Sequence, residues 1–236
     1  MAKVTPRKFK SPSPTRSSPR GRFAALVAQR TAGLYAIVDA ASVRDALSLT
    51  QALLRGGIRV VQYRAKAGVD RDLVRRLHRE TLAADALLVV NDDLEAADDA
   101  DGLHAGPEDL AVLDPDLRAR LGDRVLGLSC GTPAEVPGFR PLDADYYGVG
   151  PYARTATKAD AGEPIGPAGI AAVVAAAGAT PVVAIGGIRG DDFAAIARAG
   201  AQMAAIASAL SGAGDPETTA RELTARWARA VEAVWT

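Results

Sequence analysis

Short apolar runs alternate with stretches of helical periodicity along this chain from about residue 33 onward. Several runs are apolar at consecutive positions, as expected for parallel strands that are covered on both faces. They predict strands at residues 34–38, 58–64, 86–90, 102–105, 124–129, 145–150, 181–186 and 201–207. Between and after them, apolar residues recur every three or four positions or alanine is abundant, which predicts helices. The helices are expected at residues 43–54, 71–83, 94–99, 115–121, 133–136, 167–177, 191–199 and 218–234, the third to fifth being weakly patterned.

Strand and helix thus alternate eight times, which is typical of an α/β protein with a single (β/α)8 TIM barrel. The length of 236 residues fits one such domain. A doubly wound open sheet is the alternative, but a glycine-rich nucleotide turn would then follow the first strand, and residues 37–41 hold no glycine. The barrel also predicts where a site lies, because reactive groups in such barrels sit on loops at the carboxyl ends of the strands.

The first 22 residues differ in composition from the remainder. They hold seven basic residues and no acidic one, whereas the remainder carries 21 basic against 28 acidic residues. Because residues 1–22 are rich in Ser, Pro and Arg and poor in apolar residues, we interpret them as a disordered tail before a barrel at 23–236. A nucleic-acid-binding arm or a cleaved targeting peptide is the alternative. The acidic remainder has no basic, aromatic-lined stripe, which argues against nucleic acid as a partner.

No segment has the length or composition of a membrane span or a signal peptide, since no apolar run approaches about 18 residues. No membrane partner is therefore expected, and the cytoplasm is the default location. The single cysteine, Cys130, has no partner for an intramolecular disulfide and no metal-binding neighbours at ligand spacing. We interpret it as a buried thiol. The oligomeric state is left open, and a homo-oligomer is possible.

Polar residues follow the second predicted strand at alternate positions. Gln62, Arg64 and Lys66 share one face while the strand persists, because side chains two residues apart point the same way. Two cations with no acidic residue beside them in the sequence suit a phosphate or a diphosphate. Salt bridges to acids on neighbouring strands are the alternative for this pair.

Carboxylates follow the third and fourth predicted strands. Asp92 and Asp93 come after residues 86–90, and Glu108 and Asp109 come after residues 102–105. Acids at adjacent strand ends beside a cation-rich neighbour indicate a Mg²⁺ site, since Mg²⁺ is commonly held by one or two carboxylates together with substrate phosphates. Helix capping is the alternative for all four side chains.

The last three strands end in residues that suit a second anion. The sixth is followed by a long loop with hydroxyls and a cation at residues 155–158, and long loops on barrels are often functional. The seventh ends in paired glycines that include Gly187, which allow a ligand to approach the backbone. A helix beginning near Ser208 would offer free N–H groups, at the position where many such barrels bind phosphate.

Two histidines are present and neither indicates a general base. His78 lies in a basic helical stretch and is interpreted as a surface residue, whereas His104 is interpreted as a hydrogen-bonded barrel residue. No Ser/His/Asp order, Cys-x-x-Cys pair or dinucleotide fingerprint occurs.

The order of these motifs resembles that of the thiamine phosphate synthase family. The motifs are Q-x-R-x-K at 62–66, N-D at 91–92, H-x-G-x-E-D at 104–109, G-x-S at 127–129, G-P-x-x-x-T-x-T-K at 150–158 and I-G-G-I at 185–188. The resemblance covers about residues 33–232. It implies a (β/α)8 barrel that uses Mg²⁺ and joins a pyrimidine diphosphate to a thiazole phosphate by a dissociative substitution. Such chemistry needs charge neutralisation and alignment more than a general base.

The resemblance also implies a role for each matching position. The substrate-binding positions are Gln62, Tyr63, Arg64, Ala65, Lys66, Asn91, Ser129, Thr155, Ala156, Thr157, Lys158, Gly187, Ala207 and Ser208. Of these, Thr155, Thr157, Gly187, Ala207 and Ser208 would hold the thiazole phosphate. The pyrimidine diphosphate would be held by Gln62, Arg64, Lys66 and Asn91, and Ser129 and Lys158 would contact the pyrimidine substrate or its diphosphate. The Mg²⁺ ligands would be Asp92 and Asp109, and the catalytic residues Arg64, Lys66 and Lys158.

Three positions depart from the family pattern. Arg154 stands where Pro is usual, Pro107 where Gln is common, and Ala105 where a larger aliphatic residue is usual. None removes an implied ligand. Two alternatives remain, a thiazole tautomerase of the same wider family and a non-catalytic phosphate-binding barrel, and Mg²⁺-dependent release of diphosphate distinguishes the synthase from both.

Overall fold

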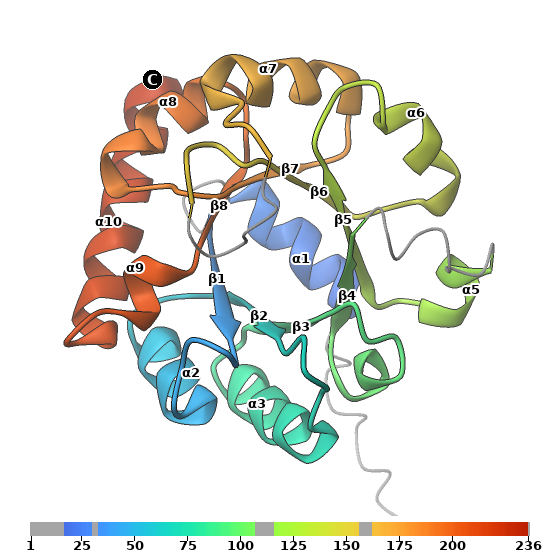
Figure 1. Ribbon diagram of the computed structural model, residues 1–236, viewed down its shortest axis with the longest axis vertical. Coiled ribbons are helices and arrows are strands. Elements are labelled where there is room, and N and C mark those ends of the chain that lie inside the picture. The colour runs from blue at the N-terminus through green and yellow to red at the C-terminus, as the bar shows by residue number, and fades with distance from the viewer. Residues whose placement is uncertain (1–16, 30–32, 107–115, 156–161, 236) are drawn as a thin grey trace, which may run out of the picture.

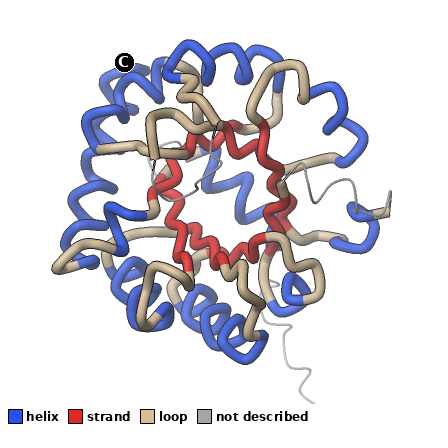
Figure 2. The backbone as a smooth tube through the Cα atoms, in the orientation of Figure 1, coloured by secondary structure: helices blue, strands red, loops and turns tan. Residues whose placement is uncertain are grey.

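The computed structural model describes residues 17–29, 33–106, 116–155 and 162–235. Within these ranges eight parallel strands close into a barrel in chain order, with β8 pairing back to β1. Figure 2 shows the strands as a ring inside a ring of helices, which confirms the predicted (β/α)8 barrel. The strands are β1 (Leu34–Asp39), β2 (Val60–Arg64), β3 (Leu87–Asn91), β4 (Gly102–Ala105), β5 (Val125–Cys130), β6 (Tyr146–Val149), β7 (Val182–Ile185) and β8 (Met203–Ile206).

The helices surround this barrel (Figure 1). They are α1 (Pro19–Ala28), α2 (Ala46–Arg55), α3 (Arg71–Ala83), η1 (Ala96–Asp99), α5 (Leu117–Leu121), α6 (Val136–Phe139), η2 (Arg140–Leu142), α7 (Gly166–Ala177), η3 (Gly190–Asp192), α8 (Phe193–Arg198), α9 (Ser208–Ser211) and α10 (Pro216–Trp235). The third to fifth predicted helices, which are weakly patterned in the sequence, correspond to the 3-10 turn η1 and the short helices α5 and α6. Among the described residues, no helix is both long enough and apolar enough to cross a bilayer.

Side chains along each strand alternate between two apolar layers, because neighbouring residues of a strand point to opposite faces. Along β1, Ala36 and Val38 pack in the layer between strands and helices, whereas Tyr35 and Ile37 pack inside the barrel. The inner layer comprises Phe23, Tyr35, Ile37, Val60, Leu87, Val89, Val125, Tyr146, Val183, Met203 and Ala205. Burial on both faces is the reason that the strands read as continuous apolar runs in the sequence.

The long helices α2 and α3 begin where an aspartate caps them. The Asp45 carboxylate accepts hydrogen bonds from the N–H groups of Leu47 and Ser48, and Asp70 caps α3 in the same way. Such caps satisfy N–H groups that have no partner inside the helix. The caps fix the end of each loop that leaves the carboxyl ends of β1 and β2.

Helix α1 covers the amino-terminal end of the barrel and is visible through the ring of strands in Figure 1. Its Phe23 belongs to the inner layer, with its ring centroid 5.1 Å from that of Tyr146. Its Arg22 forms an ion pair with Asp101, which precedes β4, and also donates a hydrogen bond to the Ala86 carbonyl before β3. The helix is therefore part of the barrel's core and not an appendage.

This helix corrects the predicted boundary of the tail. We expected residues 1–22 to be a disordered tail, but α1 begins at Pro19, and the Ser18 side chain accepts a hydrogen bond from the Gly21 N–H. Composition misled the prediction because Arg20 and Arg22 are paired with carboxylates here. Residues 1–16 lie outside the described residues, so for them the tail remains a prediction.

Replacing Arg22 by alanine is expected to lower the free energy of unfolding by about 2 kcal/mol, because the nearly inaccessible Asp101 carboxylate loses its guanidinium partner. The Leu88 N–H still donates to Asp101, so the loss is smaller than for a wholly orphaned charge. Denaturant unfolding measures the change. The matched control is Arg221→Ala, whose exposed pair with Glu217 should contribute nothing measurable. Equal losses in the two variants would contradict a structural role for α1.

Candidate active site

A cavity of about 620 Å³ opens at the carboxyl ends of the strands, the position predicted for the site. Predicted residues from six different strand ends converge on it. The predicted residues that line it are Gln62, Arg64, Lys66, Asn91, Asp92, Ser129, Thr155, Gly187, Ala207 and Ser208. Four predicted residues, Ala156, Thr157, Lys158 and Asp109, lie outside the described residues, as does the departing Pro107, and their roles remain predictions.

The alternation along β2 decides which side chains of residues 62–66 reach the cavity. Gln62 and Arg64 face inward and line it, together with Lys66 just beyond the strand end. Tyr63 is buried in the outer layer, and Ala65 packs against the same layer. The Tyr63 and Ala65 side chains therefore point toward the helices, so a contact of these two residues with substrate stays a prediction that only their backbone could fulfil.

Both predicted cations of this segment have acidic partners in the folded chain. Arg64 forms an ion pair with Asp39, its partner in register on β1, and Lys66 Nζ lies 2.5 Å from Asp92 Oδ2. The salt bridges to neighbouring strands, which were the alternative interpretation of these two cations, are thus present. It does not exclude anion binding, because all four side chains line the cavity and Lys66 is half exposed.

Asp39 is a site residue that the sequence reasoning missed. Its side chain is only 6% exposed, and besides pairing with Arg64 it accepts a hydrogen bond of 2.9 Å from the Ala41 N–H. The sequence does contain a signal for this residue, namely an acidic residue at the end of an apolar run. Asp39 follows directly on the run at 34–38, and Asp92 follows the run at 86–90 after one intervening residue.

Asp92 adopts an uncommon backbone conformation at the end of β3. Its φ is 63°, in the left-handed region, while its N–H donates a hydrogen bond of 2.8 Å to the His104 carbonyl. Asp tolerates this region better than most residues, and such conformations concentrate at functional sites. The next residue, Asp93, caps η1 by accepting from the Ala96 N–H, as the capping alternative predicted for it.

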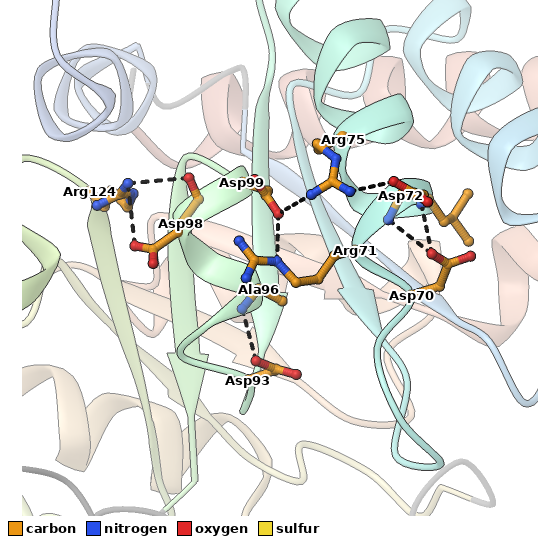
Figure 3. A network of polar contacts seen from close by, with 10 residues as sticks. Asp70, Arg71, Asp72, Arg75, Asp93, Ala96, Asp98, Asp99 and Arg124 are labelled. Carbon is orange, nitrogen blue, oxygen red and sulfur yellow. Dashed lines mark hydrogen bonds and ion pairs between the residues drawn. The ribbon is translucent and has the colours of Figure 1, made fainter.

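Ion pairs on the outer surface hold the segment that follows Asp92. Figure 3 shows Asp99 at the end of η1 contacting two arginines of α3, with Arg71 Nε at 2.7 Å and an Arg75 terminal nitrogen at 2.9 Å. The hydrogen bond from Arg71 lowers the pKa of the Asp99 carboxyl below its usual value. Asp98 pairs with Arg124 on the other side. These contacts anchor η1 to both neighbours, which limits the movement of the loop that presents Asp92.

The donors that the structure places at the predicted metal site suit Mg²⁺ bound together with a substrate. Asp92 supplies a partly exposed carboxylate and Asn91 an amide oxygen at the cavity wall. Within the described residues no three acidic, His or Cys side chains cluster as a complete metal site. Mg²⁺ is usually held by one or two carboxylates, water and substrate phosphates, so this incomplete set fits the ion.

His104 lines the cavity and forms hydrogen bonds through both ring nitrogens. Its Nδ1 is 3.0 Å from the Tyr146 hydroxyl, and its Nε2 is 3.0 Å from Ser129 Oγ. Burial lowers the pKa of the His104 imidazole to about 4, so the ring is neutral at neutral pH. This confirms the interpretation as a hydrogen-bonded barrel residue. The interpretation of His78 is wrong, since that side chain is three-quarters covered and lies 3.3 Å from the Asp101 carboxylate.

The cavity wall formed by the β6 and β7 loops requires glycine. Gly186 and Gly187 have φ values of 94° and 67°, and a Cβ on Gly187 would lie 2.6 Å from the Arg154 carbonyl oxygen. The two loops also pair through a hydrogen bond of 2.9 Å from the Ala153 N–H to the Gly186 carbonyl. Gly187 lines the cavity, and the contact of its backbone with a ligand stays a prediction.

Further groups that favour an anion lie beside these glycines. Arg154 and Arg189 line the cavity there, and α9 begins at Ser208 on its rim. The first N–H groups of a helix have no partner within it. Arg154, which stands where Pro is usual in the family pattern, thus adds a cation to this wall.

Ala105 and Cys130 are both buried. Ala105 is buried in the outer layer, so its small size affects the contact with helices and not the cavity. Cys130 is a buried thiol, as predicted, and burial raises its pKa to about 11.

Comparisons with known proteins identify the family of the chain. A family model described as thiamine monophosphate synthase matches residues 34–210. The chain belongs to this family. The thiamine-phosphate synthase of Herpetosiphon aurantiacus is 40% identical over 201 residues, which cover 82% of this chain and 96% of that protein. That of Moorella thermoacetica is 41% identical over 186 residues, which cover 76% and 87%.

A solved structure has the same fold as this thiamine monophosphate synthase family member. It is a thiamine phosphate pyrophosphorylase from Pyrococcus furiosus, with a TM-score of 0.74 and 28% identity, covering 89% of this chain and 100% of that one. The family resemblance stated from the motifs is thereby confirmed. Together the comparisons support thiamine-phosphate synthase activity, which is a transferase activity.

Proposed function

We propose that this cavity joins a pyrimidine diphosphate to a thiazole phosphate, forming thiamine phosphate and releasing diphosphate. Membership of the thiamine monophosphate synthase family carries the proposal. The geometry supports it, because one cavity holds two regions suited to anions. One region contains Arg64, Lys66 and Asp92, and the other contains Gly187 and the start of α9 at Ser208. A coupling enzyme needs both regions, whereas a tautomerase needs only the second.

The first region would bind the diphosphate of the pyrimidine substrate. Arg64 and Lys66 would donate charge-assisted hydrogen bonds to its oxygens, exchanging them for part of their present contacts with Asp39 and Asp92. Bound through Asp92, and through Asp109 by family resemblance, Mg²⁺ would neutralise charge on the leaving diphosphate. The neighbouring Asn91 would contact the same group.

The second region would bind the phosphate of the thiazole. The Gly187 backbone and the first N–H groups of α9 offer donors without an intervening side chain. Ser208, Ala207 and Thr155 lie in the same wall. Two anions held at separate strand ends leave the space between them for the two rings, which aligns the reacting atoms.

The proposed reaction is a dissociative substitution. The bond between the pyrimidine methylene and the diphosphate breaks, and the thiazole nitrogen then forms the new bond to the methylene carbon. The contribution of Arg64 and Lys66 grows as negative charge develops on the leaving group, which is the condition for lowering the barrier. No protein base has to remove a proton in these steps, and the neutral, low-pKa His104 agrees with that.

The decisive experiment supplies purified protein with the pyrimidine diphosphate, the thiazole phosphate and Mg²⁺. Thiamine phosphate and one equivalent of diphosphate are expected, measured by chromatography and by a coupled diphosphate assay. Omission of Mg²⁺ is the control. Isomerised thiazole phosphate without thiamine phosphate would replace the proposal by a tautomerase. The absence of both reactions in folded protein would leave a non-catalytic phosphate-binding barrel.

A further inference from the structure

Four cationic side chains line the described part of the cavity, and acids balance only two of them. The two at the end of β2 form ion pairs with the two carboxylates that line the cavity among its described residues. The other two are Arg154 and Arg189, which are called the arginine pair below. Neither forms an ion pair with a carboxylate within the described residues. The wall that holds the arginine pair therefore carries positive charge that no described carboxylate offsets.

The arginine pair comes from two neighbouring loops that meet at Gly187. Arg154 follows β6 and Arg189 follows β7, and these two strands are paired in the barrel. The Arg154 carbonyl oxygen lies 2.6 Å from the position that a Cβ on Gly187 would take, and Arg189 is the second residue after Gly187. Both long side chains thus start beside Gly187, where an anion could contact a backbone that no side chain covers.

Hydrogen bonds hold the backbone of both loops in place. Directly before Arg154, the Ala153 N–H donates to the Gly186 carbonyl at 2.9 Å. The Arg189 N–H donates to the Asp192 carboxylate at 2.8 Å. The two arginines are nevertheless exposed. Binding an anion would therefore restrict their side chains and not the loops, which keeps the entropic cost of binding small.

We propose that the arginine pair determines specificity for the phosphate of the thiazole substrate and binds it without Mg²⁺. The two guanidinium groups would donate charge-assisted hydrogen bonds to the phosphate oxygens. A phosphate monoester carries about 1.5 to 2 negative charges at neutral pH, which two cations match. The arginine pair has no described carboxylate to displace, so no metal ion is needed to offset one. The cations at the end of β2 differ in this respect, because each exchanges a carboxylate for the diphosphate.

This inference rests on the proposed function, since it takes the thiazole phosphate as the ligand. It goes beyond the family resemblance, because Arg154 stands where the family pattern has Pro. The role therefore belongs to this chain. It assigns to the arginine pair the recognition of one phosphate group and no part in bond making.

Calorimetric titration of the full chain in EDTA tests the proposal, with the thiazole phosphate and the same thiazole without its phosphate as probes. The phosphate is expected to bind without Mg²⁺ and to strengthen binding at least about tenfold. Arg154→Met and Arg189→Met should each weaken binding of the thiazole phosphate about 3- to 10-fold and leave binding of the unphosphorylated thiazole unchanged.

The matched control is Arg198→Met, which removes an exposed arginine of α8 that does not line the cavity and should change neither affinity. Thiazole phosphate that does not bind in EDTA, unchanged affinity in either variant of the arginine pair, or equal weakening by Arg198→Met would overturn the proposal. Because the two arginines are exposed, their replacement should leave thermal unfolding unchanged.

Kinetics with each substrate varied in turn distinguish specificity from a structural role. Arg154→Met should raise KM for the thiazole phosphate about 3- to 10-fold, leaving KM for the pyrimidine diphosphate unchanged and kcat within about twofold, since the contact is made equally before and during the reaction. Arg154→Lys keeps the charge and should recover most of the lost affinity. A rise in both KM values, or a loss in kcat alone, would contradict the role of the arginine pair.

Failure of the arginine pair and failure of the proposed function give different results. The titration needs no turnover, so metal-independent binding that depends on both arginines supports the inference even in a protein that forms no thiamine phosphate. Conversely, protein that forms thiamine phosphate with the same KM for the thiazole phosphate after either substitution keeps the function and loses the inference.

Discussion

Asp92→Asn is expected to lower the rate of thiamine phosphate formation about 10²-fold, a rise in the barrier of about 3 kcal/mol. The carboxylate lies at the cavity wall on a backbone held in the left-handed region, and Asn tolerates the same conformation. The substitution therefore removes the charge with little change in shape. Because Mg²⁺ is bound by charged oxygen, the concentration of Mg²⁺ that gives half-maximal rate should also rise.

Asp93→Asn is the matched control for this prediction. Asp93 is the adjacent residue of the same type, but its carboxylate caps η1 by accepting from the Ala96 N–H. Asparagine is also a good capping residue, so the Mg²⁺ titration curve should stay close to that of the unchanged protein. Identical Mg²⁺ curves for Asp92→Asn and the unchanged protein would remove the metal assignment. Thermal unfolding of both variants shows whether a loss of activity reflects the fold.

The barrel could be predicted because each of its strands can be recognised from its own short stretch of sequence. Strands covered on both faces need consecutive apolar residues, and each predicted strand lies within two residues of its observed bounds at either end. The strand order then follows from the barrel itself, in which each strand pairs with the next. Helix α3 was predicted at its observed bounds from the spacing of its apolar residues, whereas α2 begins three residues later than predicted.

Helix α1 could not be predicted from local pattern, because its stability comes from distant residues. Within it only Phe23 is buried, and the helix has no strong apolar face. What places it is the end of the barrel, where Arg20 and Arg22 meet Asp145 and Asp101 from far along the chain. A basic, proline-containing segment thus looks like a tail until its partners are known.

Residues of the candidate site could be predicted from the sequence, but the ion pairs between them could not. Alternation at the end of β2 identified Gln62 and Arg64, whereas Tyr63 was named through the family resemblance and has its side chain in the outer layer. The partners Asp39 and Asp92 depend on the register between strands, which the sequence of one strand does not specify. The hydrogen bonds that join Tyr35, Tyr146 and His104 likewise depend on which side chains the closed barrel brings together.

Arg64→Ala is expected to lower kcat by about 10- to 100-fold while changing KM for the thiazole phosphate little. The Arg64 guanidinium would contact the leaving diphosphate, and a charge-assisted contact that strengthens as charge develops acts mainly on kcat. Ser208→Ala, in the region proposed for the thiazole phosphate, should instead raise KM for that substrate with a smaller effect on kcat. Steady-state kinetics with each substrate varied in turn measure both.

The ion pair with Asp39 offers a second explanation for any loss in Arg64→Ala, namely that the buried Asp39 carboxylate is left without a partner. The double variant Asp39→Asn/Arg64→Ala separates the two explanations, because it removes the orphaned charge without restoring a cation. If Arg64 acts on the leaving group, the double variant should recover thermal stability and remain slow. A double variant that regains both stability and kcat would show that Arg64 serves only to balance the charge of Asp39. Among the described residues of β2 and its loop, Lys66 alone would then neutralise the diphosphate.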